Sequence, residues 1–284
     1  MPKKKTAAED VSQRLSQIKQ AALVQRTTDE LKAEQLSLFD VAPWADDMRA
    51  MPNDYMRSAL FTVRNKKQKR IALEGKAIFH VNKDVTITYT GIELRADDDE
   101  LVWQQVLEYA KRFPLGMPVH FTMYQLCKDL DWSINGRYYK KAEDCLSRLQ
   151  ATAMKVTSDR LGKLDSLSLI DGFKILDRGT KKALCQVQMA AEMVYLFAGD
   201  HYSKFIWDKY RNLTPIARRL FDYQVSHKEP FPLKLETFRL MCGSESARPA
   251  KWKEQTKDAC TELVASGLVA SSWVEGNAIL CLRN

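Results

Sequence analysis

Two similar segments of the chain limit its possible folds more than any other feature. The segment LEYAKRFPLGMPVHFTMYQLC, at 107–127, aligns without a gap with FDYQVSHKEPFPLKLETFRLM, at 221–241, at a separation of 114 positions (221 − 107). The alignment matches Tyr109 with Tyr223 and one proline with another. Because apolar periodicity alone repeats apolar residues and not a tyrosine and a proline together, we interpret the repeat as an internal duplication.

Each copy has the same predicted order of elements: a helix, a proline-marked link, a short helix, a tight turn, a longer basic helix and a pair of strands. A helix-turn-helix followed by a β-hairpin is a winged helix. We therefore predict an α+β chain with two tandem winged-helix domains, at 56–205 and 206–284, preceded by a flexible arm at 1–55. Within the arm, apolar residues recur at helical spacing over 11–22, which predicts a transient or partner-dependent helix.

The longer helix of each copy has an apolar face that would pack inward. One extra residue in the preceding turn is predicted to move the repeat separation from 114 to 115, which aligns Cys145 with Cys260 (260 − 145). The predicted core positions are Tyr138, Ala142, Cys145, Leu146 and Leu149 in the first copy and Trp252, Ala259, Cys260, Leu263 and Val264 in the second.

The remaining faces of these two helices are basic. The residues predicted to contact DNA are Arg137, Lys140, Lys141 and Arg148 in the first copy, and Arg248, Lys251, Lys253, Gln255 and Lys257 in the second. A recognition helix presents the residues near its start to base edges in a major groove. Because cations at a helix start oppose the helix dipole, stability alone would favour acids there, whereas a polyanionic partner favours cations.

The predicted hairpins and the whole chain are also basic. Further cations predicted to contact DNA, in turns after the first basic helix, are Arg160, Lys163, Arg178 and Lys181, and Lys182 adds a cation to the same turn. The chain has a formal net charge of +8, which suits a nucleic-acid partner. The alternative for each helix is an ordinary surface helix rich in lysine and arginine, since these residues favour helices.

One basic run lies outside the repeat. Residues 64–70 read RNKKQKR. Such runs are usually solvated faces, so this one is only a weak indication of phosphate contact.

No catalytic constellation is recognisable in the sequence. The P-loop pattern is absent, the four histidines are scattered, and the six cysteines show no CxxC or Cys/His spacing. No apolar run approaches the roughly 18 residues that span a bilayer. We therefore expect a cytoplasmic binding protein without enzymatic activity, cofactor, metal or membrane contact.

Extended stretches of the chain resemble a known family. EQLSLFD, TYTGIELRADDDELVWQQVLEYAKRFP and LTPIARRLFDYQVSHKEPFPLKLETFRLMCG are similar to segments of the tandem winged-helix plasmid replication initiators that bind origin repeats called iterons. The resemblance implies a protein that binds double-stranded iteron DNA as a monomer, helps open an adjacent AT-rich region, contacts the resulting single strands, and is inactive as a homodimer. It also implies cooperation with the host initiator protein, the replicative helicase and the sliding clamp.

The resemblance assigns the clamp contact to a short peptide. Clamp-binding peptides of this class contain a glutamine, a leucine and a leucine-phenylalanine pair, and the corresponding positions here are Gln35, Leu36, Ser37, Leu38 and Phe39. In such a peptide, apolar anchors fill a preformed pocket of the partner while an amide fixes the register. We expect this segment to lie in the flexible arm, where its apolar residues have no core to join.

Two other functions use the same features. A transcriptional repressor would have the same DNA-binding body without replisome contacts. A relaxase or recombinase would act at the origin as an enzyme.

Overall fold

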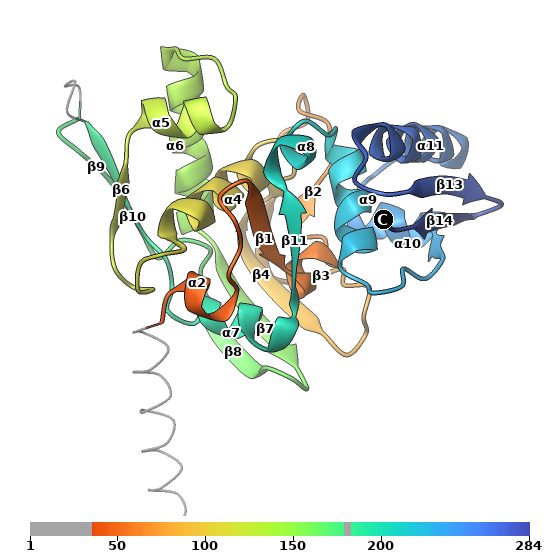
Figure 1. Cartoon of the computed structure of the whole chain (residues 1–284), viewed down its shortest axis with the longest axis horizontal. Helices are drawn as coiled ribbons and strands as arrows, with labels where there is room; N and C mark the ends of the chain where they lie inside the picture. The colour runs from red at the N-terminus through yellow and green to blue at the C-terminus, as the bar shows by residue number, and fades with distance from the viewer. Residues whose placement is uncertain (1–35, 179–182) are drawn as a thin grey trace, which may run out of the picture.

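The computed structural model describes residues 36–178 and 183–284 (Figure 1). The predicted helix at 11–22, Gln35, Lys181 and Lys182 lie outside these residues. The described part mixes helices with short strands, and residues 215–284 gather on the right of Figure 1.

The first copy of the repeat forms a winged helix. Its elements are α4 (Asp99–Ala110), β6 (Val119–Phe121), α5 (Met123–Asp129), α6 (Gly136–Gln150), β9 (Gly172–Leu176) and β10 (Leu184–Gln188). The strands form an antiparallel sheet in the order β6-β10-β9. The β9–β10 hairpin is therefore the wing, and α6 is the third helix of the motif.

The second copy repeats this arrangement. Its elements are α9 (Pro215–Val225), β12 (Leu233–Lys234), α10 (Leu235–Met241), α11 (Pro249–Ser266), β13 (Ser271–Glu275) and β14 (Ala278–Leu282). The strand order is β12-β14-β13, which matches β6-β10-β9 position by position. The predicted pair of tandem winged helices is confirmed.

Local sequence signals explain where several of these helices start. Four helices begin with a short polar residue whose side chain accepts a hydrogen bond from a backbone N–H of the first turn. These residues are Asp98 at α4, Thr122 at α5, Asn135 at α6 and Thr214 at α9. Short polar residues at this position satisfy amide groups that have no partner within the helix. α11 instead begins with a proline, whose missing N–H costs nothing at this position.

Burial shows how the two copies correspond residue by residue. Cys145 and Ala259 are both buried, as are Leu149 and Leu263, and both pairs are 114 positions apart (259 − 145, 263 − 149). The predicted shift to 115 is therefore wrong, and Val264 is 40% exposed instead of buried. At a separation of 114 positions, the start of α10 at Leu235 corresponds to position 121, two residues before the start of α5 at Met123. This earlier start compensates for the longer turn after α10, so α6 and α11 remain aligned at a separation of 114.

A hairpin inserted into the first copy separates α6 from its wing. β7 (Ala153–Ser158) and β8 (Gly162–Leu167) pair with β3 (Ala72–Ile78) and β4 (Thr86–Ile92) in an antiparallel sheet of order β3-β4-β7-β8. The prediction that strands after α6 lead directly into the wing is wrong, since the residues up to Leu167 complete this second sheet. Arg160 and Lys163 thus belong to the β7–β8 hairpin and not to the wing.

Residues 36–55 belong to the folded body, so the prediction of a flexible arm up to residue 55 is wrong for this part. They form α2 (Leu38–Val41), β1 (Met48–Pro52) and the start of α3 (Asn53–Met56). β1 pairs antiparallel with β11 (Tyr202–Ile206). Apolar side chains along the segment have no exposed area, including those of Leu38, Met51 and Tyr55, and their burial holds the segment in place.

Of the remaining short elements, two precede the first winged helix in the chain and three lie between the two copies. They are β2 (Phe61–Thr62), β5 (Leu94–Arg95), α7 (Met193–Phe197), η1 (Ala198–Asp200) and α8 (Trp207–Arg211). One continuous cluster of buried apolar residues extends from Leu38 to Ile279. Arg219 of α9, fully buried, binds Glu100 of α4, so the two copies are packed directly against each other.

Candidate nucleic-acid interface

The outer face of α6 carries the cations predicted for the first copy. Arg137 lies exposed in the first turn. Lys140 is exposed and pairs with Asp144 at 2.8 Å, one helical turn later. The Lys141 ammonium lies 4.1 Å from the centre of the Trp132 ring, a cation–π contact. All three side chains are therefore on the surface near the start of the helix.

Arg148, the fourth predicted cation of α6, turns inward. Its Nε and Nη2 atoms donate to Oδ1 of Asp99 at 2.9 and 2.8 Å, and its Nη2 lies 3.2 Å from Sγ of Cys145. A buried carboxylate at the start of α4 engages the guanidinium of Arg148, so Arg148 is not among the cations that α6 exposes for a partner. Glu262 occupies the equivalent position of α11 and accepts hydrogen bonds from Thr214, at the start of α9.

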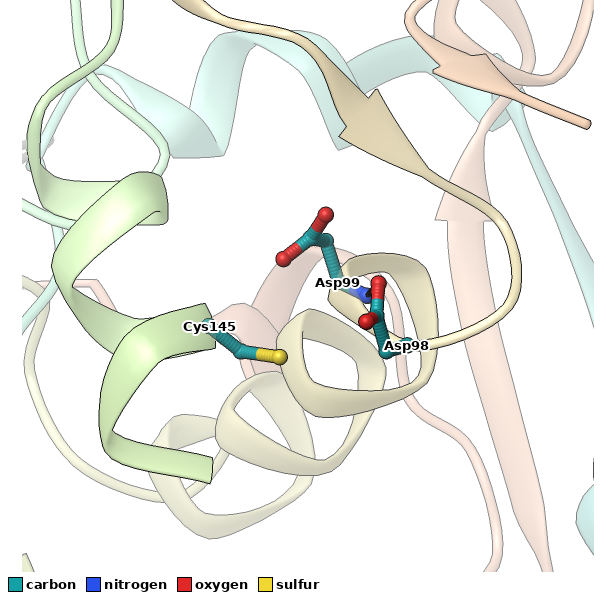
Figure 2. Close-up of side chains that lie close together, drawn as sticks. All are labelled: Asp98, Asp99 and Cys145. Carbon is teal, nitrogen blue, oxygen red and sulfur yellow. Dashed lines mark hydrogen bonds between the residues drawn. The ribbon is translucent and has the colours of Figure 1, made fainter. Parts of the chain in front are cut away.

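Asp98, Asp99 and Cys145 form a cluster in which the potential ligand atoms lie within 4.8 Å of one another (Figure 2). Two guanidinium groups bind its carboxylates: Arg70 lies 2.8 Å from Asp98 and 2.6 Å from Asp99, and Arg148 contacts Asp99. The two guanidinium groups supply positive charge to both carboxylates. The cluster is therefore an ion-pair network that ties α6 to the start of α4.

The same network shifts the pKa values of its two carboxyls in opposite directions. Burial raises the pKa of Asp99 to about 6, and the adjacent Asp98 carboxylate adds to this rise. Burial also raises the pKa of Asp98, but the attraction of Arg70, Lys141 and Arg148 together brings it below its ordinary value. Asp98 therefore ionises at a lower pH than Asp99.

The start of α11 carries the cations predicted for the second copy. Arg248 stands at the N-cap, and Lys251 and Lys257 are exposed. Lys253 donates to the carbonyl of Gly276, in the turn of the β13–β14 wing, at 2.6 Å. Gln255 is half-buried and lines a hollow beside the helix. The exposed members form a basic surface, whereas Lys253 holds the wing against the helix.

The other predicted cations that the structure describes lie in two places, after β9 and in the β7–β8 hairpin. Arg178, just after β9, pairs with Glu143 of α6 at 2.7 Å and stays largely exposed. Arg160 binds Asp54 at 2.9 Å and the carbonyl of Tyr195 at 3.0 Å, so it supports the N-terminal segment. Lys163 pairs with Asp165 on β8. Arg160 and Lys163 are therefore separated from the wing, contrary to the prediction that grouped them with it.

The structure brings the basic run 64–70 to a place that the sequence did not indicate. Lys66 and Arg70 line a hollow beside α6, together with Arg137. Asn65 and Gln68 line the hollow beside α11, together with Lys251 and Gln255. The loop thus lies between the two candidate recognition helices. The high density of cations in the run was the one signal of this role.

The peptide predicted to bind a clamp is largely docked on the body. Leu38 has no exposed area, whereas Leu36 is 37% exposed. The amide of Phe39 donates to the carbonyl of Lys111 at 2.7 Å, and the guanidinium of Arg112 lies 4.5 Å from the centre of the Phe39 ring. The expectation that these apolar residues have no core to join is therefore wrong for Leu38.

Comparison with known proteins gives the family. A family model described as TrfA protein matches residues 3–283. A plasmid replication initiator protein TrfA from Escherichia coli is 66% identical over 281 residues, which cover 99% of this chain and 74% of that protein. The chain belongs to the TrfA family. The resemblance to plasmid replication initiators is confirmed, and the chain is a replication initiator of this family.

A solved structure supports the fold. Domains 2 and 3 of RctB align with a TM-score of 0.50 at 8% sequence identity, over 75% of this chain and 85% of that one. At this identity the likeness concerns the arrangement of helices and strands alone. Within residues 36–178 and 183–284, no helix is long and apolar enough to cross a membrane.

Proposed function

We propose that this initiator binds iteron repeats of double-stranded origin DNA, with α6 and α11 as its two recognition helices. The observation that carries the proposal is their equivalence: both are the third helix of a winged helix, and both present exposed cations near their first turn. Arg137 and Lys140 on α6 and Lys251 on α11 are the central residues. A tandem pair of such helices can read two segments of one duplex.

The proposal includes the later steps that the family resemblance implies. The bound initiator would help open an AT-rich region, contact the single strands, and act with the host initiator protein and the replicative helicase. A homodimer would be its inactive form. It would do this by binding alone, without catalytic turnover.

The proposed clamp contact uses residues 35–39 and requires a local rearrangement. Leu38 can enter a pocket of the sliding clamp only after it leaves the core, because it has no exposed area in the docked position. The cost of this release lowers the apparent affinity for the clamp. The clamp segment would therefore exist in a docked and a released form.

We expect Arg137→Ala and Lys251→Ala each to weaken binding to origin DNA by about 1–2 kcal/mol, because each removes an exposed cation from a recognition helix. Fluorescence anisotropy with a labelled origin duplex measures the change. Lys163→Ala is the matched control, since it removes an exposed lysine from β8, away from both helices, and its dissociation constant should equal that of the wild type.

A footprint on origin DNA separates the candidate functions. Protection of direct repeats is expected, while protection of a promoter alone would favour the repressor. Nicking or covalent joining of supercoiled origin DNA would replace the binding mechanism with an enzymatic one. Equal affinity of all three alanine variants would contradict the assignment of α6 and α11.

A further inference from the structure

The basic loop at 64–70 links the surfaces of the two candidate recognition helices. It carries five cations and no acid. In Figure 1 it rises after β2, between α6 on the left and α11 on the right. Its residues line both hollows: Lys66 and Arg70 beside α6, and Asn65 and Gln68 beside α11. A surface rich in cations thus runs from one helix to the other, although Asp97, Asp98 and Asp144 also line the hollow beside α6 and Glu245 lines the one beside α11.

Three arginines fix the loop: Arg64 and Arg70 at its two ends, and Arg95 of β5, which contacts its backbone. Arg70 is bound by the carboxylates of Asp98 and Asp99, and Arg64 lies 2.8 Å from Glu245. Arg95 donates to the carbonyl oxygens of two loop residues, Asn65 at 3.2 Å and Gln68 at 2.9 Å. These contacts fix the conformation of the backbone. The terminal arginines therefore serve as anchors and are not available to a partner.

The three lysines of the loop, unlike its two arginines, extend their side chains into solvent. Lys66, Lys67 and Lys69 are all exposed. Lys66 pairs with Asp97 at 2.9 Å, and among the residues that the structure describes no ion pair is recorded for Lys67 or Lys69. A lysine ammonium is a compact charge that suits phosphate oxygens without requiring a planar geometry. The fixed loop thus presents ammonium groups to solvent.

We propose that the loop binds the phosphate backbone of the duplex between the two segments read by α6 and α11. The inference rests on the proposed DNA binding by these helices. When two helices enter the grooves of one duplex, the intervening backbone must pass over the surface between them. Contacts to phosphates fix the position of a protein on DNA without reading sequence. The acids that line the hollows are each paired with a cation: Asp97 with Lys66, Glu245 with Arg64, Asp98 with Arg70 and Asp144 with Lys140. They therefore oppose such contacts little.

The test compares the double variant Lys67→Ala, Lys69→Ala with the wild type on two probes. One is an origin duplex long enough to span both helices, and the other is an unrelated duplex of equal length. The variant should bind both about tenfold more weakly at low salt. The slope of log affinity against log salt should fall by about two, because each neutralised phosphate contributes about 0.9.

The control is the double variant Lys155→Ala, Lys163→Ala, which removes two exposed lysines from the β7–β8 hairpin. It should keep the affinity and salt slope of the wild type. An unchanged affinity and slope in the loop variant, together with weaker binding by Lys251→Ala, would overturn this inference and leave the recognition helices in place. Failure of the wild type to bind either duplex would overturn the proposed function itself. Circular dichroism confirms that each variant is folded.

Discussion

Replacing Arg219 with methionine should lower the free energy of unfolding by about 3–5 kcal/mol, the cost of leaving buried charges without their partner. The guanidinium lies 2.6 Å from Asp222 and 3.1 Å from Glu100 and donates to the carbonyls of Met56 and Ser58 at 3.0 and 2.6 Å. None of the three charged side chains has exposed area. Urea unfolding measures the loss.

The direction of the pH dependence provides a second readout for Arg219→Met. In the wild type, burial and the nearby Glu100 raise the pKa of Asp222 despite the attraction of Arg219. Without the guanidinium, which lowers the pKa of Asp222 by its attraction, the pKa of this carboxyl in the folded state rises further. A group with a raised folded-state pKa contributes stability at low pH and loses it as the pH increases. The deficit of the variant should therefore be smaller near pH ~5 than near pH ~8.

Two further variants test the cause of this loss. Adding Glu100→Gln and Asp222→Asn to Arg219→Met should recover part of the stability, because the unpaired charges are removed. Arg211→Met is the matched control: Arg211 pairs with Asp208 and Asp131, whose side chains are largely exposed, so its loss should cost less than about 1 kcal/mol. A similarly small effect of Arg219→Met would show that the buried network does not hold the two winged helices together.

The second large effect is expected at Leu38, where alanine should reduce the free energy of unfolding by about 2–5 kcal/mol. The side chain is fully buried, and its segment is held by backbone hydrogen bonds from Phe39 to Lys111 and from Leu115 to Leu36. Truncation leaves a cavity in the core. Urea unfolding measures the change, and Leu36→Ala is the control, because that side chain is 37% exposed and should cost little. Equal midpoints for both variants would mean that the docked segment is not populated in solution.

The docked position of Leu38 also has a consequence for clamp binding. A synthetic peptide that contains residues 35–39 should bind the clamp more tightly than the whole chain does, because it has no docking contacts to break. Surface plasmon resonance compares the two affinities. If the whole chain binds more tightly than the peptide, either the segment is released at no cost or other parts of the chain contact the clamp.

Much of the candidate interface was predictable because the spacing of apolar residues in a surface helix shows which of its side chains are buried and which are exposed. The apolar stripe of α6 could only point inward, so Arg137 and Lys140 had to lie outside. The same spacing could not predict the position of the Arg148 side chain, because it binds Asp99, which is 49 positions away in the chain. The same holds for Arg160, whose partner Asp54 lies 106 positions earlier.

The sequence by itself determined that this chain contains two winged helices and that their long helices are basic. Periodicity, caps and an internal repeat are local signals, and they specify local structure. Only the tertiary structure decided which cations are free and what lies between the helices. Ion pairs at long sequence separation hold Arg70 and Arg148 inward and fix the loop at 64–70 between α6 and α11. Leu38 is buried in the core although its neighbours in the sequence are largely polar, so the local pattern did not predict its position.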